Sequence, residues 1–181
     1  TASEMIFLEG YLFDKDQGKE AFRQASRMTR TAGGRAGIAI SDPFCVNRHR
    51  NDFIEMIKND LDFVIGNEHE IKSLYETNDL EAAMSKTADM IKLMVCTRSG
   101  DGVTIMSNGE RHDIPVNKIT PVDATGAGDQ FAAGFIYGMV TGRDLETCGK
   151  MGNLCAAEVI SHIGPRPATD MRREFARARL E

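Results

Sequence analysis

Several residue types and sequence features are scarce in this chain, and their scarcity excludes several classes of protein. It contains no tryptophan and only 5 prolines in 181 residues, too few prolines for a collagen-like or proline-rich chain. Lysine and arginine total 22 against 27 aspartates and glutamates, a net charge of -5, which argues against a surface built to neutralise nucleic-acid phosphates. No stretch of apolar residues is long enough to span a membrane. We therefore expect small-molecule or protein partners, and neither nucleic acid nor membrane.

Cysteine is also scarce. None of the four cysteines lies in a C-x-x-C pair, which fits a reducing compartment better than a disulfide framework. The first residues, Thr1-Ala2-Ser3-Glu4, lack the basic and apolar stretches of a secretory signal. A cytoplasmic location is therefore expected. Since the first residue is not methionine and an apolar run begins at Met5, we expect the chain to be a fragment that starts at a strand inside a sheet.

Short apolar segments alternate with longer amphipathic ones, a pattern that predicts a mostly parallel sheet flanked by helices. Strands are expected at Met5–Leu8, Ala36–Ile40, Leu61–Ile65 and Leu93–Thr97. Helices are expected at 17–31, 47–58, 68–75, 79–90, 127–140, 144–161 and 168–179. Asn108-Gly109 between two short apolar runs predicts an antiparallel hairpin that finishes the sheet. No linker or repeat stands out, so the chain is expected to be one domain or part of one.

The most informative stretch contains Gly126-Ala127-Gly128 directly before an apolar helix. Three small residues let the backbone turn sharply and leave its N–H groups unblocked by side chains. These amides and the positive end of the helix dipole favour an anion, usually a phosphate. Asp129 follows in the first helical turn, where it either caps the dipole or accepts a proton from a hydroxyl that attacks a phosphoryl group. Taken alone, the turn is equally consistent with phosphate binding and with a structural role.

Other nucleotide-binding motifs do not fit the sequence. The pattern G-x-x-x-x-G-K-[ST] of the P-loop is absent. The third glycine of the dinucleotide-binding fingerprint would fall at Phe131, and a proline precedes the motif where a central strand would be needed. A dehydrogenase is therefore a weak alternative.

The segment from Asp123 to Asp129, followed by Phe131-Ala132-Ala133-Gly134, resembles the C-terminal signature of the ribokinase-like (PfkB) carbohydrate and nucleoside kinase family. Six of the seven positions of D-T-T-G-A-G-D match, and Ala124 departs from it. Three further segments resemble the family's N-x-x-E motif, its nucleotide-binding strand and turn, and the helix that borders the adenine: 67–70, 95–103 and 152–157. Residues 7–12 and 41–44 look most like the bacterial branch of adenosine kinases.

The resemblance implies an α/β fold, a ribokinase-like three-layer αβα sandwich whose sheet is mostly parallel. It implies that residues 1–181 are the C-terminal part of a single kinase domain, without the N-terminal part that carries the lid and the early strands. The implied activity is ATP-dependent phosphorylation of a primary hydroxyl of adenosine or a related sugar or nucleoside. ATP and Mg²⁺ are the implied cofactors, with K⁺ as an option, and a homodimer is left open for the full-length protein.

The family's roles fall on particular residues. Asp129 is implied as the catalytic base, and the anion hole is implied to be formed by the amides of Gly126, Ala127 and Gly128. Contacts to the nucleotide are implied for Thr97, Arg98, Gly100, Gly102 and Asn153. Backbone oxygens at Asp123 and Thr125 match positions that bind a monovalent cation in several relatives.

Two of these assignments have ordinary alternatives. Asn67 and Glu70 would hold Mg²⁺ largely through waters, as that strongly hydrated ion prefers, but the same spacing forms a capping box at the start of a helix. Arg98 would neutralise charge beside the phosphates or simply face solvent. The competing hypothesis for the whole chain is a non-catalytic nucleotide-binding module or a truncated, inactive fragment. Asp129 with an intact glycine turn favours the kinase, whereas a missing lid favours the inactive fragment.

Overall fold

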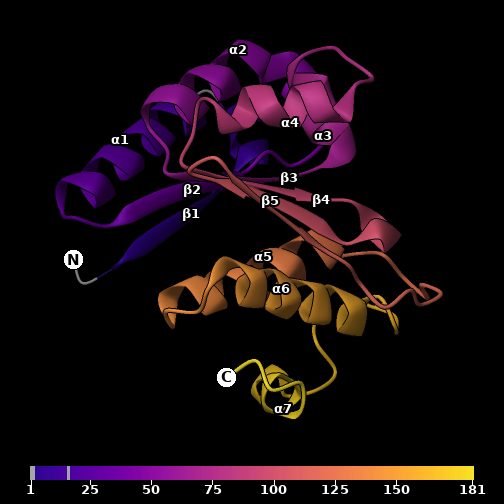
Figure 1. Cartoon of the computed structure of the whole chain (residues 1–181). Coiled ribbons are helices and arrows are strands. Elements are labelled where there is room, and N and C mark those ends of the chain that lie inside the picture. Colours follow the sequence, from indigo (N-terminus) through magenta and orange to yellow (C-terminus); the bar gives the residue numbers. More distant parts are fainter. Residues whose placement is uncertain (1–2, 16) are drawn as a thin grey trace. The chain divides into compact units, whose positions relative to one another are not determined.

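The computed structural model of the chain describes residues 3–15 and 17–181 (Figure 1). These residues form two compact units. The first extends to Thr97 and also contains residues 106–111, and the second contains residues 98–105 and 112–181. Within the described residues, no helix is both long and apolar enough to cross a membrane.

Six strands form one sheet in the order in which they occur along the chain. The strands are β1 (Met5–Glu9), β2 (Arg35–Ala39), β3 (Phe63–Asn67), β4 (Leu93–Thr97), β5 (Val103–Ser107) and β6 (Glu110–Ile114). The first four are parallel to one another, and the sheet ends in antiparallel strands. Asn108 and Gly109, both with positive φ, make the turn between β5 and β6, so the predicted hairpin is confirmed. β1 lies at one end of the strand order.

Four α-helices cover one face of the parallel strands in the first unit (Figure 1). They are α1 (Gly18–Thr31), α2 (Pro43–Asn59), α3 (Glu68–Leu74) and α4 (Leu80–Ala88), and a short 3₁₀ helix, η1 (Gly10–Asp14), follows β1. Their apolar faces meet the sheet in one core, whose largest members are fully buried. These include Ile38, Ile40, Phe53, Met56, Ile57, Ile71, Leu74, Met84 and Met94.

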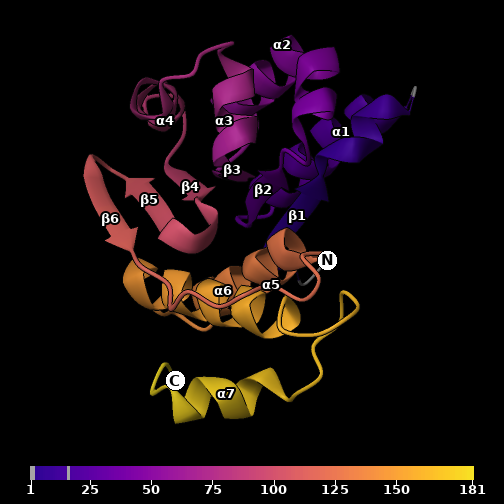
Figure 2. The same cartoon turned by 90° about the vertical axis from the view of Figure 1, so that its right-hand side faces the viewer.

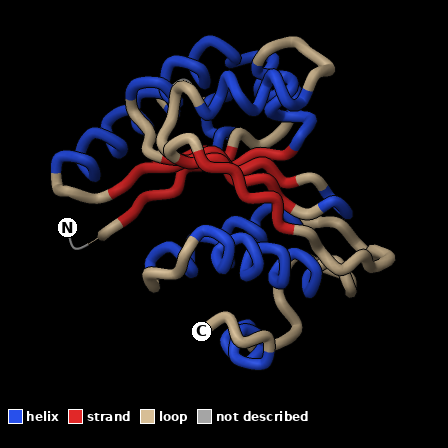
Figure 3. The backbone as a smooth tube through the Cα atoms, in the orientation of Figure 1, coloured by secondary structure: helices blue, strands red, loops and turns tan. Residues whose placement is uncertain are grey.

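The second unit contains α5 (Ala127–Val140), α6 (Leu145–Val159), α7 (Met171–Arg177) and a 3₁₀ turn, η2 (Ser99–Asp101). Figure 2 shows α5 and α6 side by side. Phe175 of α7 stacks on Tyr137 of α5, with ring centroids 5.6 Å apart. Two loops of this unit, residues 115–126 and 160–170, have no regular structure (Figure 3).

Two helix starts differ from the predicted ones by more than one residue, and each difference has a local cause. The expected helix 47–58 already begins at Pro43, because Asp42 accepts a hydrogen bond from the Cys45 amide and proline is favourable in the first helical turn. The expected helix 168–179 begins only at Met171, where Asp170 caps it. All four cysteines are buried thiols, as expected without a disulfide framework.

Candidate active site

The glycine turn lies at the start of α5 in the second unit. Gly126 is the residue before the helix and has φ 80° and ψ 3°, the left-handed conformation that glycine adopts without strain. A Cβ atom on Gly126 would lie 2.7 Å from Cβ of Pro165, so contact with Pro165 also requires glycine there. Four other helices, α2, α4, α6 and α7, begin with an aspartate whose side chain accepts from a backbone amide. No side chain caps α5 in this way.

Some backbone N–H groups of the turn form hydrogen bonds inside it, and others form none. The Ala127 amide donates to the Ala124 carbonyl over 3.2 Å, and the Gln130 amide donates to the Gly126 carbonyl over 2.9 Å. Within the part of the chain that the structure describes, the amides of Gly126, Gly128 and Asp129 form no hydrogen bond. Two of the three amides predicted for the anion hole are therefore unbonded, Ala127 is engaged inside the turn, and Asp129 supplies an amide that sequence analysis did not assign.

The Asp129 carboxylate is exposed. Among residues 3–15 and 17–181 it has neither a hydrogen bond nor an ion pair. Gly128 has a negative φ, and no atom lies within 4 Å of the position that its Cβ would occupy. Glycine in a helix costs roughly 1 kcal/mol relative to alanine, and neither packing nor strain requires it here. The space that a side chain of residue 128 would occupy is therefore open. These features fit a bound phosphate with a carboxylate beside it.

The predicted nucleotide-binding turn follows β4. Thr97 is the last residue of β4, and the Arg98 amide then donates to the Gly102 carbonyl over 2.7 Å to close a tight turn. Gly100 lies in η2, and Gly102 has φ 88° and ψ -134°. The Arg98 guanidinium lies 3.5 Å from the Asp113 carboxylate. Its buried Nε has no hydrogen-bond partner in the described part of the chain.

Three other predicted residues also have contacts within the second unit. The Asn153 amide group donates to the carbonyls of Ile114 and Pro115, both over 3.4 Å. The Asp123 carboxylate accepts from the amide and hydroxyl of Thr125 and from the Gly164 amide. The hydrogen bond from the Thr125 hydroxyl, with those from the two amides, lowers the pKa of Asp123 to about 2. These contacts fix the loops on either side of α5, and the roles predicted for the three residues stay predictions.

Asn67 and Glu70 form the capping box that was the ordinary alternative to metal binding. The Asn67 side chain accepts from the amides of His69 and Glu70. In return, Glu70 Oε2 accepts from the Asn67 amide over 2.8 Å, and Glu70 Oε1 accepts from Asn67 Nδ2 over 2.5 Å. The described residues contain no cluster of three or more His, Cys, Asp or Glu side chains that could hold a metal ion directly. Any ion here would therefore be held largely through water.

Glu70 is buried close to two other acids. Only 6% of its surface is exposed, and burial, with smaller contributions from the charges of Asp42 and Glu9, raises its pKa to about 7. Glu9 ends β1, Asp42 follows β2, and Glu70 follows β3, so the carboxyl ends of three parallel strands bring these acids together. A hydrated divalent cation would relieve their repulsion, and this environment fits one.

Replacing Glu70 by glutamine is expected to flatten the pH dependence of stability. The raised pKa means that the folded chain resists ionisation of Glu70, so its stabilising effect is complete below the unfolded pKa near 4.5 and lost as the pH rises to 7. The wild type should lose up to about 3 kcal/mol across this window. Urea unfolding in metal-free buffer between pH 4.5 and 7.5 measures it. Glu20→Gln, in an exposed position on α1, is the control, and parallel curves for wild type and Glu70→Gln would contradict the prediction.

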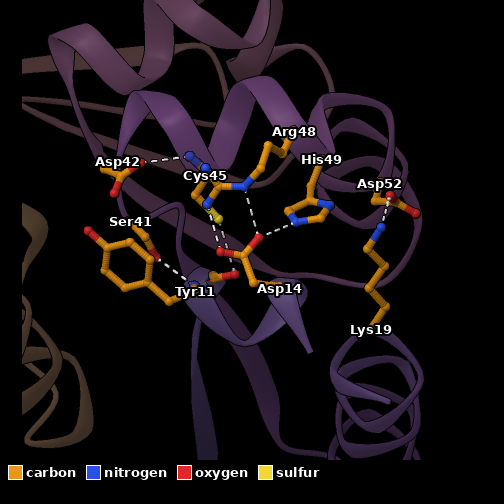
Figure 4. Close-up of polar contacts among 10 residues, drawn as sticks. Tyr11, Asp14, Lys19, Ser41, Asp42, Cys45, Arg48, His49 and Asp52 are labelled. Atoms are coloured by element: carbon orange, nitrogen blue, oxygen red, sulfur yellow. Dashed lines mark hydrogen bonds and ion pairs between the residues drawn. The ribbon is translucent and has the colours of Figure 1, made fainter. Parts of the chain in front are cut away.

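A polar network that was not predicted from the sequence holds η1 against α2 (Figure 4). Asp14 accepts from Arg48 over 2.6 Å and lies 2.6 Å from Nε2 of His49. The Tyr11 amide donates to the Ser41 hydroxyl over 3.0 Å, and that hydroxyl donates to the Glu9 carboxylate. A hydrogen bond to Asp42 raises the pKa of the Tyr11 phenol to about 12. The only signal in the sequence was the resemblance of residues 7–12 and 41–44 to one branch of kinases, which gave no contacts.

Comparison with known proteins gives a consistent family assignment. The model of the pfkB family of carbohydrate kinases matches residues 1–171. An uncharacterized sugar kinase of Archaeoglobus fulgidus is 35% identical over 121 residues, which cover 66% of this chain and 47% of the relative.

Two solved structures resemble nearly the whole chain. A probable sugar kinase from Rhizobium etli has a TM-score of 0.96 and 39% identity, and the adenosine kinase from Sinorhizobium meliloti has a TM-score of 0.95 and 38% identity. Each covers 98% of this chain, which in turn covers 55% of each. The chain thus spans about half the length of these relatives. The predicted ribokinase-like α/β fold is confirmed, and the chain belongs to the pfkB family of carbohydrate kinases.

Proposed function

We propose that the chain carries the catalytic and ATP-binding residues of a kinase that phosphorylates a primary hydroxyl of adenosine or a related nucleoside or sugar. One observation carries the proposal. The turn before α5 presents the unbonded amides of Gly126, Gly128 and Asp129 together with an exposed, unpaired Asp129 carboxylate. Among pfkB family members this pairing of anion-binding amides with a carboxylate suits phosphoryl transfer, which needs positioning and charge stabilisation above all.

In the proposed reaction, the acceptor oxygen forms a bond to the terminal phosphorus of ATP while the bond from that phosphorus to the ADP oxygen breaks. The hydroxyl proton passes to the Asp129 carboxylate. The glycine-turn amides donate to the oxygens of the moving phosphoryl group. Each donor of this kind contributes about 3 kcal/mol to transition-state stabilisation in other anion holes. The Ala127 amide, predicted as a third donor, would first have to leave the Ala124 carbonyl.

Mg²⁺ is the proposed metal, and when bound it neutralises charge on the ATP phosphates. Asn67 and Glu70 would hold its water shell. Asp42 and Glu9 support this role: their charges add to the effect of burial in raising the pKa of Glu70, and the negative charge of the three acids together favours a nearby cation.

The remaining predicted contacts are part of the same proposal. Thr97 and the backbone at Gly100 and Gly102 would line the nucleotide phosphates. Arg98 would have to turn its guanidinium away from Asp113 to reach them. Asn153 would border the adenine, and a K⁺ ion at the backbone oxygens of Asp123 and Thr125 is part of the proposal. That residues 1–181 form the C-terminal part of a longer domain, and that the protein is cytoplasmic or a homodimer, stay predictions.

The activity of the protein encoded by the complete gene tests the proposal. Purified protein with ATP and Mg²⁺ is given adenosine, cytidine, ribose and fructose separately, and both ADP and the phosphorylated acceptor are quantified. We expect phosphorylated product with at least one acceptor, adenosine first, since an adenosine kinase is among the similar structures. ATP binding without turnover of any acceptor would instead support the non-catalytic nucleotide-binding module, and absence of ATP binding would exclude both.

A further inference from the structure

A second segment of the chain presses against the glycine turn. Residues 162–168, here called the strap, follow α6 and have no regular structure. The contact that brings the strap to the turn is between Pro165 and Gly126. The hypothetical Cβ of Gly126 would lie 2.7 Å from Cβ and 3.1 Å from the carbonyl oxygen of Pro165. The two residues therefore pack closely against one another, although they are far apart in the sequence.

Hydrogen bonds fix the strap at three points. Gln130 Nε2, in the first turns of α5, donates to the Pro165 carbonyl over 3.2 Å. The Gly164 amide donates to the Asp123 carboxylate over 3.0 Å, and the Ala168 amide donates to the Glu158 carboxylate over 2.9 Å. Only 10% of the Glu158 side chain is exposed. The Ala168 end of the strap is therefore bonded to a nearly buried carboxylate.

The turn needs such support because it lacks the usual means of fixing a helix start. No side chain caps α5, and a helix that begins without a cap leaves its first amides free to fray. Of the three fixing points, only Gln130 joins the strap to α5 itself, immediately after Asp129. Its hydrogen bond to Pro165 therefore links the start of α5 to the strap, and the strap in turn contacts Gly126 directly before α5.

We propose that Gln130 is a positioning residue that keeps Pro165 against Gly126 and so holds the amides of the glycine turn in the geometry that binds phosphate. The expected effect of Gln130 on nucleotide affinity rests on the proposed function. The expected effect of Gln130 on the order of the turn in the absence of ligand does not.

The test compares the wild type with Gln130→Met, which keeps the side-chain length and removes the donor. Without ligand, exchange of the Ala127 amide, measured by NMR, should quicken about fivefold, as expected for the loss of one net hydrogen bond, and the Gly126 and Gly128 resonances should shift. With a non-hydrolysable ATP analogue as the probe, the dissociation constant should rise about fivefold. Gln130→Lys, which restores a donor, should return Ala127 exchange toward the wild-type rate. Gln24→Met, on the exposed face of α1, should change none of these quantities.

The outcomes separate the two proposals. Unchanged Ala127 exchange in Gln130→Met would overturn the role of Gln130, whatever the protein binds. Faster exchange in Gln130→Met together with no binding of the ATP analogue by the wild type would support the mechanical role and overturn both the proposed function and the effect on affinity. Faster exchange with an unchanged dissociation constant would overturn the link between the strap and phosphate binding.

Discussion

Replacing Asp129 by asparagine is expected to lower the rate of phosphoryl transfer by about 10²- to 10⁴-fold, the usual contribution of a general base, and to leave the fold intact. The carboxylate is exposed and unpaired within the described residues, so its removal breaks no internal contact. Asparagine keeps the shape and polarity of the side chain but cannot accept the hydroxyl proton at neutral pH. The loss should appear in kcat, with little change in the dissociation constant for ATP.

A matched control separates catalysis from helix capping. Glu20 lies in the first turn of α1, as Asp129 lies in the first turn of α5, and within the described residues it likewise forms no hydrogen bond or ion pair. Both acids are favourable beside the positive end of a helix dipole. Glu20→Gln should therefore show the change in stability expected from loss of the dipole interaction alone, as in Asp129→Asn, and should not change the rate. Steady-state kinetics of the protein from the complete gene, with the acceptor it proves to use, measures the effect, and equal rates for Asp129→Asn and wild type would exclude Asp129 as the base.

Gly102→Ala is expected to destabilise the chain by about 3 kcal/mol or more. Gly102 has φ 88° and ψ -134°, a conformation that is essentially restricted to glycine. The added Cβ would also lie 2.0 Å from the Ile114 carbonyl oxygen, and a backbone atom cannot move aside as a flexible side chain can. Backbone strain of about 1–3 kcal/mol and an overpacking cost of about 1–3 kcal/mol combine at this position.

Gly109→Ala isolates the effect of the clash. Gly109 also has a positive φ, 81°, but no atom lies within 4 Å of its hypothetical Cβ. This variant should cost only the strain of a left-handed alanine, about 1–2 kcal/mol. Urea unfolding of both variants measures the difference between them. Equal losses would mean that the chain around Ile114 relaxes freely, which would contradict the tight turn between Arg98 and Gly102.

Elements with strong local signals could be predicted closely. Met5–Leu8, Leu93–Thr97 and 127–140 match β1, β4 and α5 to within a residue, because continuous apolar runs and a glycine turn act over short distances. The Asn108-Gly109 turn was predictable for the same reason. The start of α2 could not be predicted, because Ser41-Asp42-Pro43 is compatible with both a loop and a capped helix. The Asp42 hydrogen bond to the Cys45 amide settles that choice.

By itself, the sequence determined the fold class and the residues of the glycine turn, because short-range periodicity, small residues and the family signature are local properties. Tertiary structure alone decided which amides of the turn are unbonded and brought Pro165 and Gln130 to Gly126. It also gathered Glu9 and Asp42 around Glu70 at the ends of three strands. Contacts between distant segments depend on how strands and loops pack, and that packing decides both the pKa of Glu70 and the support of the phosphate-binding turn.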